Sequence, residues 1–205
     1  GASGLFDGTG DYLTTPNHAD FSFDAGDFTI EFWIRPNGSQ AGDTGILNFG
    51  NAQGAPVDTN WIVYMNGLSI TFLASTTGAD WEVIVSIGTL TSAVWAHIAI
   101  VRSGNVYTPY INGVAGTPVT VSGSIQNINS PLEIGRWVRT GGTNYFNGWL
   151  DEFRISKGMA RWTANFTSPT SAYSASALPL TSSRYWTFAD WQSGRALINT
   201  DIGMY

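Results

Sequence analysis

Apolar and polar residues alternate with a period of two along most of the chain, a pattern that predicts half-buried β-strands. The alternation is clearest in residues 27–36 (DFTIEFWIRP), where every second side chain from Phe28 to Ile34 is apolar and Pro36 ends the run. The intervening side chains, on the opposite face, are Thr29, Glu31, Trp33 and Arg35. Similar stretches predict further strands within residues 60–74, 82–87, 95–102, 107–117, 131–137 and 149–156.

Two Asn-Gly pairs interrupt this pattern. Asn66-Gly67 and Asn112-Gly113 each stand between two strand-like runs, and Asn-Gly at the centre of a two-residue loop supplies the positive φ angles of a type I′ turn. Other turn residues separate the predicted strands by about 8–15 residues, the spacing of an antiparallel sandwich or barrel. The sequence predicts one short helix, over residues 157–163.

The composition narrows the range of possible functions. Charged residues make up only 12% of the chain, against about 25% in an average soluble domain, and nine residues are tryptophan. The net charge is −6, and the nine basic residues are spread along the chain, which argues against nucleic-acid binding. No apolar run approaches the roughly 20 residues of a membrane-spanning helix, so we expect no membrane insertion. The absence of cysteine excludes disulfides and thiolate metal sites.

The composition changes near the C-terminus. Residues 168–183 are rich in Ser, Ala and Pro, and an aromatic stretch, residues 184–191 (RYWTFADW), follows them. We therefore expect a β-domain over residues 1–173 and an aromatic C-terminal extension over residues 174–205. The extension has two interpretations: it folds back on the domain as a strand or strap, or it is an assembly contact for a neighbouring subunit.

Five stretches occur in the order in which a known family has them. They are GLFDGTGDYLTTP (4–16), GDFTIEFWIRP (26–36), WAHIAIVRSGNVYTPYINGV (95–114), LEIGRW (132–137) and FNGWLDEFRISKGMARWTANFTSP (146–169). In these stretches the chain resembles the laminin-G-like, concanavalin A-like jelly-roll family, and the last is most similar to versions in bacteriophage tail and other virion proteins. The resemblance implies an all-β fold, a two-sheet antiparallel β-sandwich, located in a virion or at an extracellular cell surface. Because such virion proteins are commonly multimeric, it favours the assembly contact and a homo-oligomer.

Asp151 and Glu152 are adjacent carboxylates inside the predicted strand 149–156. Alternation places Asp151 on the face of Trp149 and Phe153, which we interpret as the core face, and Glu152 on the opposite face. Residues on opposite faces cannot flank one glycosidic bond, which needs two carboxyl groups about 5–10 Å apart in one cleft. Hydrolases of the resembling fold carry a Glu-x-Asp-x-x-Glu run that this sequence lacks. We therefore expect a protein that is not an enzyme; a depolymerase with an unrecognised site is the least favoured interpretation.

A carboxylate that points inward must be hydrogen-bonded, paired or bound to a cation. The favoured interpretation is that Asp151 accepts backbone N–H bonds from a loop such as residues 8–11. The alternative is Ca²⁺ as a cofactor, since this cation takes several carboxylate and carbonyl oxygens. Its predicted ligands are Asp7, Asp11 and Asp151. His97 alternates with apolar neighbours in a predicted strand, and we expect it to be a packed structural residue.

The aromatic residues carry the remaining functional signal. Indole rings stack on the apolar C–H faces of sugars, while Asn and Arg side chains bind hydroxyl groups. Residues 136–145 combine both with a glycine-rich loop, and the predicted ligand-binding residues are Arg136, Trp137, Arg139, Asn144 and Tyr145. We expect a carbohydrate-binding adhesion domain of a phage or bacterial surface assembly, with a cell-surface or polymeric glycan and other assembly subunits as partners. The alternative is a structural decoration or spacer module that mediates protein–protein assembly and binds no glycan.

Overall fold

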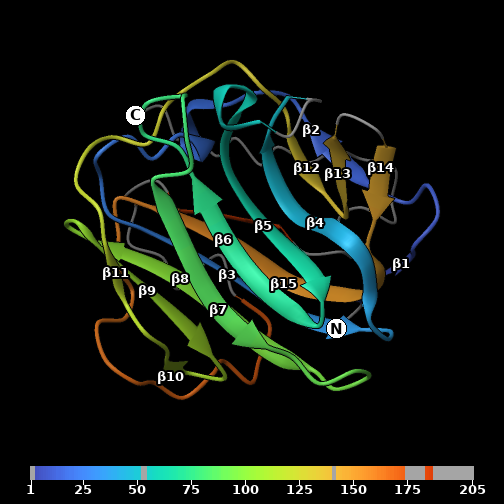
Figure 1. Ribbon diagram of the computed structural model, residues 1–205. Coiled ribbons are helices and arrows are strands. Elements are labelled where there is room, and N and C mark those ends of the chain that lie inside the picture. The colour runs from blue at the N-terminus through green and yellow to red at the C-terminus, as the bar shows by residue number, and fades with distance from the viewer. Residues whose placement is uncertain (1–2, 52–54, 140–141, 174–182, 187–205) are drawn as a thin grey trace, which may run out of the picture.

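The computed structural model describes residues 3–51, 55–139, 142–173 and 183–186. These residues form two antiparallel sheets packed face to face (Figure 1), which confirms the predicted all-β sandwich. The only helical turns among them are two short 3₁₀ helices, η1 (Ala19–Phe21) and η2 (Pro56–Asp58). No helix in this part of the chain is long and apolar enough to span a membrane.

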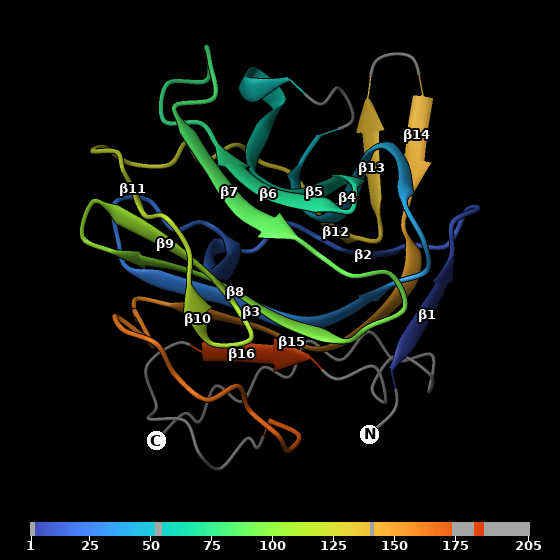
Figure 2. The same cartoon turned by 60° about the horizontal axis from the view of Figure 1, so that its bottom comes forward.

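Eight strands make the first sheet, in the order β1–β15–β3–β8–β9–β10, with β11 beside β9 and β16 beside β15. Their bounds are β1 (Gly4–Asp7), β3 (Phe28–Pro36), β8 (Ala96–Ser103), β9 (Val106–Ile111), β10 (Val114–Ala115), β11 (Val119–Thr120), β15 (Asn147–Lys157) and β16 (Ser183–Trp186). The second sheet has six strands in the order β2–β12–β4–β5–β6–β7. Their bounds are β2 (Leu13–Thr15), β4 (Gln40–Gly50), β5 (Thr59–Gly67), β6 (Ser69–Ala74), β7 (Val83–Thr89) and β12 (Leu132–Ile134). A separate two-stranded hairpin, β13 (Arg136–Arg139) and β14 (Gly142–Tyr145), stands beside the second sheet (Figure 2).

The alternation seen in the sequence builds the core between the sheets. The core-facing residues of β3 are fully buried, and so are those that face them from β5, namely Trp61, Val63 and Met65. Phe23 stacks on Phe28 of β3 with ring centres 4.0 Å apart. Because a fully buried side chain of this size contributes about 1.5–3 kcal/mol, these facing rows supply much of the stability of the sandwich.

One Asn-Gly turn has the predicted form and the other is shifted. Asn112 and Gly113 have φ angles of +51° and +77°, as a type I′ turn requires. At the first turn, however, Asn66 itself pairs with Ser69, so the loop begins at Gly67. Gly67 has φ +61°, and a glycine in the first loop position is the requirement of a type II′ hairpin, which explains the shift by one residue.

The predicted helix over residues 157–163 is not formed. β15 continues to Lys157, and residues 158–173, which we call the strap, run across the outer face of the eight-stranded sheet, the side turned away from the other sheet (Figure 2). The sheet supplies partners for backbone groups that a helix would pair within itself. Thr29 Oγ1 donates to the carbonyl of Met159 (2.9 Å) and accepts from the N–H of Arg161 (3.0 Å).

Two aromatic rings of the strap pack on this outer face. Trp162 and Phe166 stack with ring centres 3.7 Å apart and an interplanar angle of 6°. Both rings lie against Ala99, Val101 and Tyr110 of β8 and β9. The strap therefore covers a second apolar layer outside the core of the sandwich, and the eight-stranded sheet is buried on both faces here.

Part of the C-terminal extension is a strand of the sandwich. β16 pairs antiparallel with residues 153–156 of β15 and covers the edge of that strand. Residues 183–186 are therefore paired as an additional strand of this sheet. Residues 174–182 and 187–205 lie outside the described residues, so the assembly contact and the boundary at residue 173 stay predictions.

Candidate functional site

A β-bulge decides where Asp151 and Glu152 lie. Asp151 pairs with Trp33 of β3, but the next paired residue is Arg154, opposite Glu31, so two residues of β15 oppose one of β3. Glu152 is the extra residue of the bulge, and its φ angle is +48°. The bulge reverses the alternation, because Leu150, Phe153 and Ile155 all enter the core. The prediction that Asp151 and Trp149 face the core is therefore wrong, and both lie on the outer side of the sheet.

The bulge also gives Asp151 its hydrogen-bond partner. Its Oδ1 accepts from the N–H of Glu152 (2.9 Å), so a local turn bond replaces the predicted bond from residues 8–11. Burial raises the pKa of Asp151, and the Glu152 hydrogen bond opposes this. A half-buried carboxylate with a local backbone partner needs no cation.

The three predicted calcium ligands do not come together. Asp7 and Asp11 share a tight turn, where the Asp7 N–H donates to Asp11 Oδ2 (3.1 Å) and the Thr9 N–H donates to Asp7 Oδ1 (2.6 Å). In the sheet, Asp7 pairs with Asn147, the first residue of β15, four residues before Asp151 along the strand. Among the described residues, no group of three or more His, Cys, Asp or Glu side chains is placed to hold a metal ion. Calcium binding stays a prediction.

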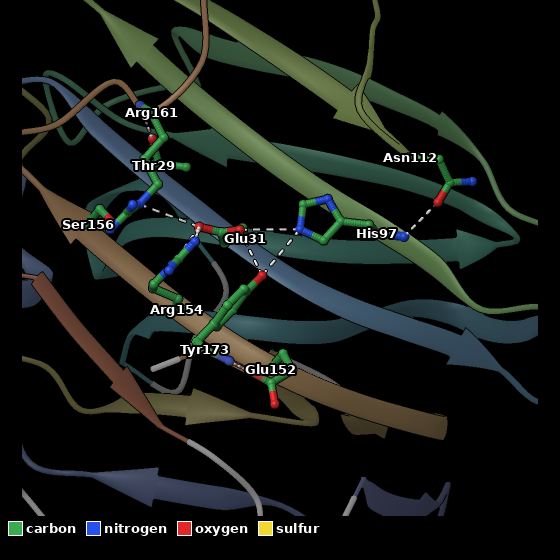
Figure 3. Close-up of polar contacts among 9 residues, drawn as sticks. All are labelled: Thr29, Glu31, His97, Asn112, Glu152, Arg154, Ser156, Arg161 and Tyr173. Atoms are coloured by element: carbon green, nitrogen blue, oxygen red, sulfur yellow. Dashed lines mark hydrogen bonds and ion pairs between the residues drawn. The ribbon is translucent and has the colours of Figure 1, made fainter. Parts of the chain in front are cut away.

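A buried polar cluster lies under the strap, and its centre is Glu31 of β3 (Figure 3). Glu31 Oε1 accepts from Arg154 Nε (2.7 Å), and Arg161 Nε is 3.6 Å away. Glu31 Oε2 accepts from the Tyr173 hydroxyl (2.7 Å) and is 3.3 Å from His97 Nε2. Each carboxylate oxygen therefore has partners from both the sheet and the strap. We call these five residues the Glu31 cluster.

The members of this cluster shift the pKa values of one another. Burial alone would raise the pKa of Glu31, but the His97 hydrogen bond, the Arg154 charge and the Tyr173 hydrogen bond together hold it below its ordinary value. Burial and the charge of Glu31 raise the pKa of Tyr173, which therefore remains a donor. Glu31 and His97 are fully buried, so the cluster has no access for a substrate, and it acts as a clamp that holds the strap to the sheet. The predicted structural role of His97 fits this placement.

Replacing Tyr173 by phenylalanine should lower the free energy of unfolding by about 1.5–3 kcal/mol, because the variant loses a hydrogen bond to a buried charge. Urea titrations followed by circular dichroism would measure the change. Tyr12→Phe is the matched control, since the Tyr12 side chain is exposed and its loss should be within about 0.5 kcal/mol. Equal losses in both variants would contradict the clamp.

All five predicted ligand-binding residues lie on the β13–β14 hairpin. The register pairs Arg136 with Tyr145 and Trp137 with Asn144. The hairpin crosses β4 at Gly45, where an added Cβ would lie 2.6 Å from the carbonyl carbon of Arg136 and 2.8 Å from Trp137 Cβ. Only a glycine lets the two backbones approach so closely. The hairpin is thus docked on the outer side of the six-stranded sheet.

Trp137 is buried where it docks. Its side chain is 3% exposed, packs against Ile62 and Leu73, and lies under the guanidinium of Arg139, 4.6 Å from the ring centre. The rings beside it that remain partly accessible are Tyr64, with ring centres 5.4 Å apart, and Trp81. Trp137 is therefore a packing residue beneath this surface. Tyr64 and Trp81 are the rings that a ligand can reach.

The strands next to the hairpin present an uncharged polar surface. Tyr64 of β5 pairs with Thr71 of β6, which pairs with Ser86 of β7, so all three side chains project from the same side. Asn66 and Ser69 form a parallel row beside them. We call the whole surface the hairpin face; it comprises the β13–β14 hairpin, Trp81 and the outward residues Tyr64, Asn66, Ser69, Thr71, Ile84, Ser86 and Thr89.

The loop that carries Trp81 is fixed by the next residue. Glu82 accepts from the Thr76 N–H (2.7 Å), from Ser75 Oγ (3.3 Å) and from Thr77 Oγ1. Desolvation opposes ionisation, but the Thr77 and Thr76 hydrogen bonds lower the pKa of Glu82 to about 2. The carboxylate therefore stays ionised across the physiological range and holds Trp81 at the end of the hairpin face.

Unsatisfied buried groups gather at this face. Of nine buried side-chain polar atoms without a partner in the described part of the chain, four belong to Asn48, Arg136 and Trp137. Asn48 lies on β4 between Ile62 and Glu133, and it is 1% exposed. A buried polar group without a partner costs stability, so these residues are held here at a cost to the fold.

Sequence analysis selected the residues of the hairpin, but as a glycine-rich loop, and it missed the surface of the adjacent strands. The five hairpin residues are close along the chain, whereas Tyr64 and Asn66 join them only through the sheet register, and Trp81 joins them through the loop before β7. The alternation in NWIVYMNG and SITFLA (residues 60–67 and 69–74) was the available signal, because it places Tyr64 and Thr71 opposite the core residues of their strands.

Comparisons with known proteins identify a family and similar solved structures. The model of the concanavalin A-like lectin/glucanases superfamily matches residues 7–164, whereas no curated protein sequence matches the chain. Similar solved structures include the Ruminococcus gnavus IT-sialidase CBM40 bound to α2,3-sialyllactose (TM-score 0.57, 12% identity, 78% of this chain and 94% of that one). Domains LG4-5 of the mouse laminin α1 chain give a TM-score of 0.55 (12% identity, 75% of this chain and 40% of that one).

A botulinum neurotoxin type C structure is also similar (TM-score 0.53, 15% identity), with 74% of this chain covered and 38% of that one. At such identities the likeness shows the fold alone, and this chain spans less than half of the neurotoxin and laminin chains. The family assignment comes from the family model, which matches most of the chain. The chain belongs to the concanavalin A-like lectin/glucanases superfamily.

Proposed function

We propose that the chain is a non-enzymatic carbohydrate-binding domain that binds a cell-surface or polymeric glycan at the hairpin face. The observation that carries the proposal is the combination of two accessible rings, Tyr64 and Trp81, with a row of hydroxyl and amide side chains on the adjacent strands. Apolar sugar faces stack on aromatic rings, and sugar hydroxyls exchange hydrogen bonds with neutral polar groups. A rigid sheet with a docked hairpin holds both kinds of group in place.

Two of the carboxylates near this face are engaged in ion pairs. Asp43 pairs with Arg139, and Glu133 pairs with Arg136. A glycosidase needs one free carboxylic acid and a second carboxylate that converges on the same bond. These pairs support binding without catalysis, and the superfamily, which includes lectins as well as glucanases, is compatible with sugar binding.

The setting that we propose is a phage or bacterial surface assembly, either a virion or an extracellular surface, in which the domain serves adhesion. The stretch FNGWLDEFRISKGMARWTANFTSP, which is similar to versions in virion proteins, supports it. Other subunits of the assembly, including copies of this chain, are the expected protein partners. Stabilisation by Ca²⁺ is part of the proposal, although the aspartates first expected to bind it do not meet.

A glycan array, probed with the purified chain in Ca²⁺ and again in EDTA, tests the proposal. Trp81→Ala should weaken reproducible hits about tenfold, because it removes a stacking ring from the face. The matched control is Trp149→Ala, since Trp149 lies on the outer side of the other sheet beside Arg35 and should not affect binding. Loss of the hits in EDTA would support calcium; equal weakening by both variants would contradict the hairpin face.

The alternative is a structural spacer or decoration module that binds no glycan. The pairing of β16 with β15 favours it, because a strand supplied by the extension is a device that could also join neighbouring copies. A blank array from correctly folded protein, together with concentration-dependent association in light scattering, would select this alternative.

A further inference from the structure

The hairpin face is poor in charge, and this restricts the glycan that it can take. β5, β6 and β7 carry no charged residue (residues 59–67, 69–74 and 83–89). Among the residues whose side chains the structure describes, the cations at the face come from the hairpin alone, as Arg136 and Arg139. The other lysine and arginine side chains that the structure describes belong to the eight-stranded sheet and the strap: Arg35, Arg102, Arg154, Lys157 and Arg161.

Arg139 is already paired. Its guanidinium contacts Asp43 Oδ2 and lies over the Trp137 ring. Asp43 is itself held in place, because Asn66 Nδ2 donates to its Oδ1 (2.8 Å) and Asn144 Nδ2 donates to its carbonyl oxygen (2.9 Å). The pair is thus part of a fixed network that joins β4, β5 and the hairpin.

Arg136 is engaged on two sides. It donates to Glu133 Oε1, and its guanidinium lies over the Tyr12 ring, 3.4 Å from the ring centre. Its side chain is only 21% exposed. A carboxylate or sulfate of a ligand would have to compete with Glu133 for this side chain.

The surroundings add negative charge. In the described part of the chain, the carboxylates Asp43, Asp80, Glu82 and Glu133 around the face outnumber the two guanidiniums. An anionic sugar at Arg139 would lie next to the Asp43 carboxylate, and juxtaposed like charges disfavour binding strongly. The other polar side chains of the face are hydroxyls and amides, which are uncharged and suit uncharged sugars.

Granted the proposed function, on which this step rests, we infer that the hairpin face is specific for neutral glycans and discriminates against sialylated, sulfated or uronic-acid-containing ones. The Asp43–Arg139 pair is the specificity device, because it occupies the cation that an acidic sugar would otherwise use.

Matched glycan pairs test this inference directly. The array should contain neutral galactose-, glucose- and mannose-based oligosaccharides, each beside its sialylated or sulfated counterpart. The expected result is binding to neutral members, with each acidic counterpart at least about tenfold weaker, a difference of roughly 1.4 kcal/mol. Hits confined to acidic glycans would overturn the inference but leave the proposed function standing. A blank array would overturn both.

A substitution that frees Arg139 provides the second test. Asp43→Asn keeps an oxygen for Asn66 but removes the charge that faces Arg139, so binding of the acidic counterparts should rise about tenfold. Asp27→Asn is the matched control, because it removes the same charge directly before β3 of the other sheet while its oxygen can still accept from the Gly104 N–H. It should leave the preference unchanged. An equal rise in both variants, or none with Asp43→Asn, would overturn the role of the pair.

Discussion

Replacing Glu31 by alanine is expected to lower the free energy of unfolding by about 3–5 kcal/mol, a large share of the stability of an ordinary domain. The substitution removes the carboxylate that holds Arg154 and Arg161, so it leaves two buried guanidiniums without their counter-charge. It also removes the acceptor of the Tyr173 hydroxyl, which ties the end of the strap to the sheet. Chemical denaturation followed by circular dichroism would measure the loss.

Two further variants make this result decisive. Glu31→Gln keeps an oxygen acceptor but not the charge, so its loss should be smaller than that of the alanine variant, and it provides a measurement if the latter does not fold. Asp80→Ala removes an exposed carboxylate and should change the free energy of unfolding by no more than about 0.5 kcal/mol. If Glu31→Ala unfolded at the same denaturant concentration as the parent, the clamp would be refuted.

The same cluster predicts a loss of stability in acid. The pKa of Glu31 is lower in the folded protein than its ordinary value, so its contribution is fully present above the pKa of the unfolded chain, about 4.3. It is lost as the pH falls below that value and through the folded pKa. Unfolding titrations between about pH 7 and pH 3 should therefore show a smaller pH dependence in Glu31→Gln than in the parent.

The sequence predicted which face of β3 carries Glu31, but not that the strap covers it. The alternation in DFTIEFWIRP places Glu31 opposite the core residues, and on a one-sided sheet that position would be solvated. A signal existed in AHIAIVRS (residues 96–103), whose almost continuous apolar run is typical of a strand buried on both faces. Trp162 and Phe166 cover the outer face of this strand. Because they are about 60 residues further along the chain, the sequence alone does not show that they pack on it.

The bulge at Glu152 could not be predicted from the sequence, for a different reason. A residue with positive φ is usually glycine or asparagine, and a glutamate there gives no warning that the alternation is about to reverse. The two-residue step depends on the register of β15 against β3, which is a property of the assembled sheet. The prediction from alternation, that these four residues face the core, is therefore correct for Phe153 and Ile155 and wrong for Trp149 and Asp151.

Gly45 is the residue on which the hairpin face most depends. Replacing it by alanine places a Cβ against the backbone of Arg136 and against Trp137 Cβ, and backbone atoms cannot move aside as a flexible side chain would. We expect a loss of about 1–3 kcal/mol in stability, the usual cost of overpacking, while the core between the sheets stays intact. The hairpin must lift from β4, so Arg139 and Asn144 lose their positions relative to Asp43.

Glycan binding should fall more than stability does. With the hairpin displaced, the affinity of Gly45→Ala should drop at least about tenfold, and near-UV circular dichroism should change because Trp137 leaves its contact with Tyr64. Gly26→Ala is the control, since its added Cβ meets only the Phe23 carbonyl oxygen, at 3.2 Å, on the other side of the molecule's core. Asn144→Ala removes one hydrogen bond to β4 without forcing the backbones apart, so it should weaken binding while the protein still folds. Parent-like binding and an unchanged melting temperature in Gly45→Ala would show that the close approach of hairpin and sheet does not shape the site.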